Sequence, residues 1–110
     1  MAFKMILTPT FSAAVTVNVP NDKGGFDKND FVAIFKRPTT AQAQALRMEA
    51  GLSNEDLLRR QLVGWKLADE NAEDVPFSDA TLEAALAISP TPMAMAVAFW
   101  ESLNGARSKN

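Results

Sequence analysis

The side chains that could do chemistry in this chain are carboxylates and hydroxyls, because its 110 residues include no histidine and no cysteine. Those two absences remove the usual general base, the usual nucleophile pair and the best transition-metal ligands. Many of the carboxylates lie in the acidic segment 69–74 or in the expected first turns of helices, where water or the helix dipole stabilises their charge. Catalytic acid pairs are tuned in clefts instead, so we expect no enzyme activity.

Segment 22–30 contains the oxygen-bearing side chains that calcium prefers, together with Gly24 and Gly25. Its spacing does not fit a calcium loop, because Phe31 stands where a ligand is required and neither the central glycine nor the terminal glutamate is in place. The two glycines are also not set in the strand-loop-helix arrangement, with further glycines, of a phosphate-binding loop. We therefore expect a turn-rich hairpin loop, with no metal and no cofactor.

Composition narrows the class of protein further. A formal net charge of −2 and a sequence pI near 5.0 leave no basic stripe for nucleic acid. No apolar run approaches the ~20 residues of a membrane helix, and residues 1–7 are too short and too weakly charged for a signal peptide. The lack of cysteine fits a reducing compartment. We expect one cytoplasmic domain over residues 1–110, bound to neither membrane nor nucleic acid.

The first third of the chain predicts a β-hairpin over residues 11–36. Apolar residues alternate with small or polar ones from Phe11 to Val19, which is the period of a half-buried strand. A polar loop over 21–30 precedes a second apolar stretch, 31–36, which Pro38 ends. A lone two-stranded hairpin is marginal in water, so its apolar face must pack on another element.

Helices over residues 39–105 would supply that surface, which makes the expected fold class α+β and mostly helical. The expected helix boundaries are an N-cap at Thr39 or Thr40, a helix end near Ala50 and Gly51, N-caps at Ser53 and Ser78, and a new helix start at Pro92. About four helices follow from these signals, and residues 106–110 are expected to form a short frayed tail.

The helix that Ser53 opens is expected to continue through Trp65. One apolar stripe is formed by Leu57, Leu58, Gln61, Leu62 and Trp65. The opposite side would pair Glu55 with Arg59 and Asp56 with Arg60 at the i,i+4 spacing, which explains both arginines without a ligand. Trp65 fits either the core or a partner-binding surface, and a tryptophan at this position is more often core.

The last helix carries too many apolar residues for one neighbour. They span roughly 200° of the helical wheel, against the ~100° stripe that one packing contact requires. One interpretation is a central helix buried on two sides. The other places Trp100, Val97 and Met93 in the core and makes Met95 and Phe99 part of a protein-binding surface. The same wide face would also permit a homo-oligomer.

The second half of the chain resembles the tail assembly chaperones of long-tailed bacteriophages. The resemblance is carried, in order, by Leu62-Val63-Gly64-Trp65, the acidic loop with Asp69, Val75-Pro76-Phe77-Ser78, the helix with Leu82 and Leu86, Ser89-Pro90, the alanine-rich last helix and Gly105-Ala106-Arg107-Ser108-Lys109-Asn110. The first half fits more loosely, as a strand pair followed by a helix that starts near Pro38.

The resemblance implies a function in phage assembly. Proteins of this family bind the tape measure protein and the tail tube protein in the host cytoplasm, then leave, so that they are absent from the virion. The resemblance also implies a minority product of ribosomal frameshifting, a longer form of this chain with a second domain. A tape measure protein is long and helical, and its apolar stripes would aggregate unless covered.

Two other protein classes compete with this interpretation. A structural head–tail or tail-completion protein that stays in the virion has a similar size and charge, and its detection in purified particles would favour it. A helix-turn-helix regulator could use the short helices around Gly51, but the acidic balance and the expected pairing of Arg59 and Arg60 argue against it.

Overall fold

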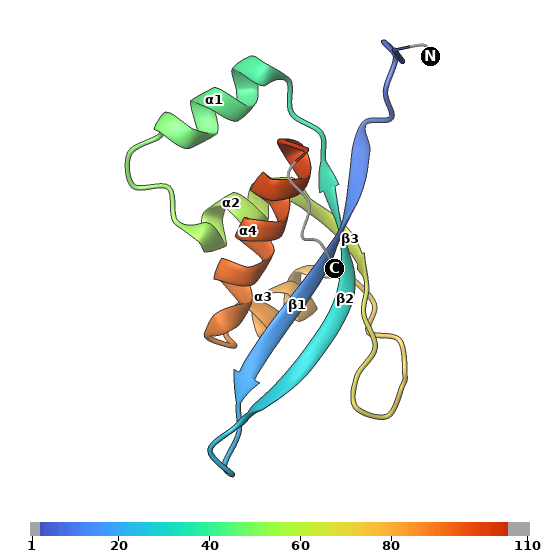
Figure 1. Cartoon of the computed structure of the whole chain (residues 1–110), viewed down its shortest axis with the longest axis vertical. Helices are drawn as coiled ribbons and strands as arrows, with labels where there is room; N and C mark the ends of the chain where they lie inside the picture. The colour runs from blue at the N-terminus through green and yellow to red at the C-terminus, as the bar shows by residue number, and fades with distance from the viewer. Residues whose placement is uncertain (1–2, 106–110) are drawn as a thin grey trace.

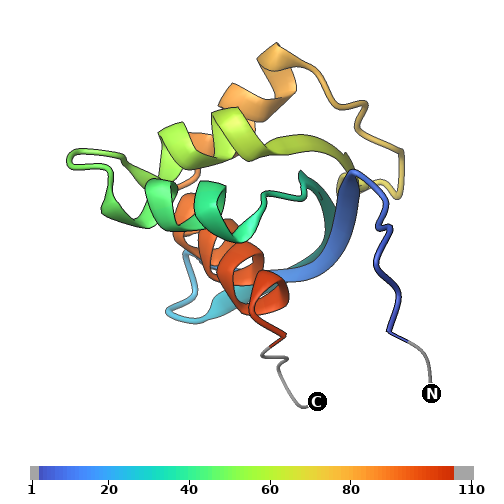
Figure 2. The same cartoon turned by 90° about the horizontal axis from the view of Figure 1, so that it is seen from above.

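The computed structural model describes residues 3–105 as one sheet with helices on one of its faces. The strands are β1 (Thr10–Pro20), β2 (Phe26–Lys36) and β3 (Leu62–Lys66), and the helices are α1 (Thr40–Met48), α2 (Asn54–Gln61), α3 (Asp79–Leu86) and α4 (Pro90–Leu103). Figures 1 and 2 show the helices gathered on one side of the curved sheet. The expected tail over 106–110 lies outside the described residues.

The sheet has three antiparallel strands in the order β1-β2-β3, so the expectation of a two-stranded hairpin in a mostly helical chain is wrong. The α+β class itself fits loosely, since the structure combines this sheet with four helices. The expected strand pair over 11–36 is present within this larger sheet. The third strand comes from the segment that was expected to be the end of a helix.

A β-bulge explains why β3 resembled a helix in the sequence. Trp65 pairs with Ala33 and Leu62 pairs with Phe35, so β3 has one more residue than the facing part of β2, and Val63 is the extra one. Such a bulge brings two residues that are three apart in sequence to the same face. Leu62 and Trp65 are both buried on that face, at the spacing a helix would also give.

The hairpin loop is shorter than expected. Strand β2 begins at Phe26, and residues 26–30 pair with the end of β1, so only residues 21–25 form the turn. Asn21 organises this turn, since its Oδ1 accepts hydrogen bonds from the backbone amides of Lys23 and Gly25, both at 3.0 Å. The polar composition of 26–30 concealed the strand, because this part of β2 is exposed to water on both faces.

Helix boundaries agree closely with the capping residues. Thr39, Ser53 and Ser78 each accept a hydrogen bond from the backbone amide three residues later. Gly51 has a φ of 79°, the left-handed conformation expected of a residue that closes a helix, although α1 itself already ends at Met48. Local signals of this kind act within one turn and need no tertiary partner.

The core lies between the inner face of the sheet and α4. The rings of Phe35 and Phe99 meet at a centroid distance of 5.1 Å, and Phe11 contacts both, at 5.6 Å from Phe35 and 5.9 Å from Phe99. Leu58 from α2 and Leu86 from α3 belong to the same buried cluster. Helix α4 therefore packs against β1 on one side and against α2 and α3 on others.

Candidate functional site: an apolar stripe on α4 and the groove beside α1

Met95 and Phe99 are fully buried, so the expectation that they form part of a surface is wrong. Each has an exposed fraction of 0%, and the Phe99 ring packs edge-on against Phe35 of the sheet. The curved inner face of the sheet takes the side of α4 that carries these two large side chains. The alternative of a helix buried on more than one side describes α4 better.

Trp65 belongs to the core, and its indole also fixes the connection that follows β3. Its Nε1 donates a hydrogen bond of 2.8 Å to the carbonyl oxygen of Val75. Its ring packs edge-on against Phe77 at 5.0 Å and against Phe31 at 6.5 Å. With 8% of its surface exposed, Trp65 does not offer a contact to another protein.

The exposed side of α4 is the one that the sequence interpretation placed in the core. Met93 is 60% exposed, Val97 is 42% exposed and Trp100 is half-buried. Their i, i+4, i+7 spacing places all three on one face of the helix. We call Met93, Val97 and Trp100 the α4 stripe.

Helix α1 borders the far end of the α4 stripe. The guanidinium of Arg47 lies 4.6 Å from the centre of the Trp100 ring, a cation–π contact, and also donates a 2.9 Å hydrogen bond to Asn104 Oδ1. A shallow pocket of about 300 Å³ lies between α1, α2 and α4, with Leu52 and Trp100 among its lining residues. Trp100 thus offers an aromatic surface that is partly open and already held in place.

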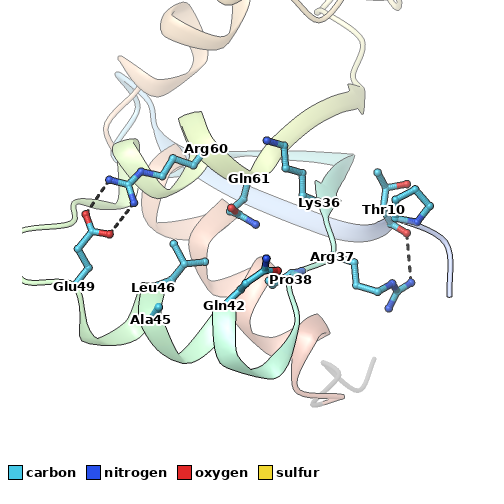
Figure 3. Close-up of a pocket in the computed structure, with 11 residues that line it drawn as sticks. Thr10, Lys36, Arg37, Pro38, Gln42, Ala45, Leu46, Glu49, Arg60 and Gln61 are labelled. Carbon is cyan, nitrogen blue, oxygen red and sulfur yellow. Dashed lines mark hydrogen bonds and ion pairs between the residues drawn. The ribbon is translucent and has the colours of Figure 1, made fainter. Parts of the chain in front are cut away.

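A larger groove of about 690 Å³ lies on the other side of α1 (Figure 3). Its apolar part includes Pro9, Pro38 and Leu46, and its polar part includes the amides of Gln42 and Gln61. An apolar floor with a few amide groups suits a peptide segment better than a small charged ligand.

Two of the three basic residues that line this groove, Arg37 and Arg60, are engaged within the chain, and Lys36 is the third. Arg60 forms a bidentate pair with Glu49, at 2.7 and 2.8 Å, and Arg37 donates to the carbonyl oxygen of Thr10 at 3.3 Å (Figure 3). Arg37 also donates to the carbonyl oxygen of Thr8 at 2.9 Å. A guanidinium that is used in this way has few donors left for an incoming anion. Since two of its three cations are used in this way, the groove resembles a phosphate or nucleic-acid site less than its lining of Lys36, Arg37 and Arg60 suggests.

The arginines of α2 do not form the expected i,i+4 pairs. Arg59 makes a bidentate contact with Glu83 of α3, at 2.7 and 2.8 Å, and a 2.8 Å contact with Asp56 one turn earlier. Hydrogen bonds from Arg59 hold the pKa of the Glu83 carboxyl below its usual value, and Arg60 acts in the same way on the pKa of Glu49. Helix α2 is thus tied to both α3 and α1.

The acidic segment forms an exposed loop, as the sequence predicted. Asp69 shapes it, because its Oδ1 accepts hydrogen bonds from the backbone amides of Asn71 at 2.9 Å and Glu73 at 3.1 Å. Within residues 3–105, no group of three or more metal-ligating side chains comes together.

The length and hydropathy of the four described helices bear on whether one of them could span a membrane. None of them is by itself long and apolar enough to cross a membrane, whereas α3 and α4 taken together would pass on length and composition, with a bend of 105° between them.

The stripe was missed because the sequence shows how wide an apolar face is and leaves open which part of it meets the sheet. The exposed fractions of Met93 and Val97 could be assigned only once α4 was placed against β1. Comparison with protein-family models, with curated proteins and with solved structures gives no match for this chain. The function of the chain is therefore to be inferred from the resemblance of its ordered segments and from these surfaces.

Proposed function

We propose that this chain is a tail assembly chaperone of a long-tailed phage, which binds the tape measure protein, and the tail tube protein, before the tube polymerises. The observation that carries the proposal is the α4 stripe, a row of exposed apolar side chains at helical spacing on the surface of a folded domain. Methionine and tryptophan are favoured at such surfaces, since methionine adapts its shape and tryptophan provides a large contact area.

A helical segment of the tape measure protein would lie along the α4 stripe. Met93 and Val97 offer two turns of apolar surface, and Trp100 extends it towards Arg47. An amphipathic helix that binds another protein does so through apolar anchors at this same spacing. Covering the apolar stripes of a long helical protein until assembly would prevent its aggregation, and the chaperone would then leave.

The test is binding of the full chain to the tape measure protein encoded by the same phage, measured by co-purification and titration calorimetry. Met93→Glu with Val97→Glu is expected to weaken binding by at least about tenfold, because charges would replace two apolar anchors. Phe26→Glu is the matched control, since Phe26 is 68% exposed on a different element. Equal binding by the two variants would exclude the α4 stripe as the interface.

The gene provides a second test that does not depend on the surface. A slippery sequence near codons 108–110, followed by an overlapping frame and a long downstream frame, would support the chaperone and its frameshifted longer form. Detection of this chain by mass spectrometry in purified virions would instead favour the head–tail or tail-completion protein. Failure to bind the tape measure protein at all would contradict the proposal.

A further inference from the structure

Three apolar side chains near the start of the chain lie almost fully in water, and a fourth is about half exposed. The exposed fractions are 85% for Phe3, 80% for Met5, 85% for Ile6 and 52% for Leu7. We call residues 3–7 the arm, which precedes the start of β1. Its first residues run away from the helices (Figures 1 and 2), whereas Leu7 borders a pocket beside α1. Burying apolar surface is favourable by about 25 cal/mol per Å², so a continuous exposed segment of this kind is typical of an interaction site.

The base of the arm is held in a fixed direction by Arg37. The Arg37 backbone amide donates a 2.8 Å hydrogen bond to the Pro9 carbonyl, and its Nε donates a 2.9 Å bond to the Thr8 carbonyl. Its guanidinium carbon also lies 5.6 Å from the centre of the Phe11 ring. Only the residues before Thr8 are therefore free of these contacts with the sheet.

A hollow lined mostly by apolar groups lies at the other end of the hairpin. Its volume is about 310 Å³, and its apolar lining includes Val17, Val19, Phe31, Leu67, Ala85 and Ile88. We call it the distal pocket. Ile88, at the turn between α3 and α4, is 46% exposed at this pocket. The volume is at the lower end of the range for ligand pockets, about 300–1,000 Å³, which suits one or two large apolar side chains.

The arm cannot fill the distal pocket of its own chain. The lining residue of the hairpin nearest to the arm is Phe31, which pairs with Val15. From Thr8 to Val15 along the extended strand is about 23 Å at 3.3 Å per residue. The five residues from Leu7 back to Phe3 extend at most about 18 Å from Thr8. An arm that occupies the distal pocket must therefore come from another molecule.

Charge favours the arm as the occupant. Lys4 interrupts the apolar residues of the arm, and Leu67 and Ala68 of the pocket lead directly into the acidic loop. Four carboxylates lie in that loop, those of Asp69, Glu70, Glu73 and Asp74. Lys28 also lines the pocket, but it lies 4.0 Å from Asp30, which offsets its charge. A lysine that enters beside the acidic loop would be attracted to it.

We propose that the chain self-associates head to tail, with the arm of one copy bound in the distal pocket of the next. Phe3 and Ile6 are the apolar anchors, and Lys4 lies beside the acidic loop of the neighbour. The two halves of this contact are different surfaces at opposite ends of the hairpin, so the interface is heterologous and each copy can bind two neighbours. This self-association uses neither Met93 nor Val97 and does not depend on the proposed chaperone function.

The first experiment measures the molar mass of the full chain by sedimentation equilibrium over a wide concentration series. The wild type is expected to self-associate, and Phe3→Ser with Ile6→Ser is expected to weaken this by at least about tenfold. Ile88→Lys should have the same effect at the pocket, with Ile88→Ser as a second variant if the lysine affects folding. Met48→Ser is the control, because Met48 is 75% exposed on α1, away from both surfaces.

Mixing the two kinds of variant tests the head-to-tail contact itself. The arm variant keeps an intact pocket and the Ile88 variant keeps an intact arm, so the mixture is expected to form a dimer that neither forms alone. Thermal unfolding checks that each variant is folded. A wild type that stays monomeric at all concentrations, an arm variant that associates like the wild type, or a mixture that stays monomeric would each overturn the proposal.

Discussion

At the scale of single residues, burial separates two sets of side chains on α4 that look alike in the sequence. Met95 and Phe99 are fully buried, whereas Met93 and Val97 are 60% and 42% exposed. All four are apolar, and all four lie within two turns of one helix. Their roles differ because the sheet covers only part of the helix surface.

Replacing Phe99 by alanine should therefore cost far more stability than replacing Val97. Phe99→Ala removes a ring that contacts Phe11 and Phe35, so we expect a loss of about 3–5 kcal/mol in the free energy of unfolding. Val97→Ala, on the exposed side, should cost less than about 1 kcal/mol. Urea unfolding of the two variants measures the difference, and similar losses would contradict the packing of α4.

At the scale of elements, β3 and the connection after it are stabilised together. Trp65 lies in β3, and its indole N–H bonds to the Val75 carbonyl, while the Val75 amide donates a 2.8 Å bond to the Leu67 carbonyl. The rings of Trp65 and Phe77 pack edge-on, with their centroids 5.0 Å apart. Trp65 thus fixes the position where the two ends of the acidic loop, at Leu67 and Val75, come together.

Trp65→Phe tests this role of the indole. We expect a loss of about 1–3 kcal/mol in the free energy of unfolding, since the Val75 carbonyl loses its donor and the smaller ring packs less well. Hydrogen exchange should accelerate more at the Val75 amide than at the centre of the β1–β2 pairing. Val63→Thr is the control, with an expected change within about 0.5 kcal/mol. Equal acceleration at both places would contradict the local role.

At the scale of the whole molecule, exposed ion pairs connect three helices that have few other contacts with one another. Arg59 joins α2 to Glu83 of α3, and Arg60 joins α2 to Glu49, the residue that follows α1. These pairs lie at the surface, so each contributes little by itself, although the bidentate geometry is favourable. Their combined effect should depend on pH and on salt.

The sign of the pH dependence follows from the lowered pKa values of Glu83 and Glu49. A carboxyl whose pKa is lower in the folded chain than in the unfolded chain stabilises the fold fully above its unfolded value of 4.5, and this contribution is lost as the pH falls through the lowered value. The melting temperature of the wild type should therefore fall in acid. Glu83→Gln with Glu49→Gln should flatten this dependence.

The control for the acid experiment is Glu101→Gln, which changes an exposed carboxylate on α4 and should leave the acid dependence as steep as in the wild type. High salt should narrow the difference between the wild type and the double variant, because exposed charges are screened. An equally steep fall in the double variant would show that the two pairs do not contribute.

The sequence by itself determined the features that depend on neighbours along the chain. The caps at Thr39, Ser53 and Ser78 are confirmed, and so is the left-handed Gly51. Alternation from Phe11 to Val19 also identified a strand. Each of these signals arises from hydrogen bonds or side-chain directions within a few residues, so no distant contact is needed to read it.

Tertiary structure alone decided the third strand and the orientation of α4. The bulge at Val63 gives β3 the spacing of a helix, and only its pairing with β2 distinguishes the two. The side of α4 that is buried depends on the curvature of the sheet that receives it, and the partners of Arg59 and Arg60 depend on where α3 and α1 lie. These features are decided by contacts between segments far apart in sequence, and local sequence patterns carry no information about such contacts.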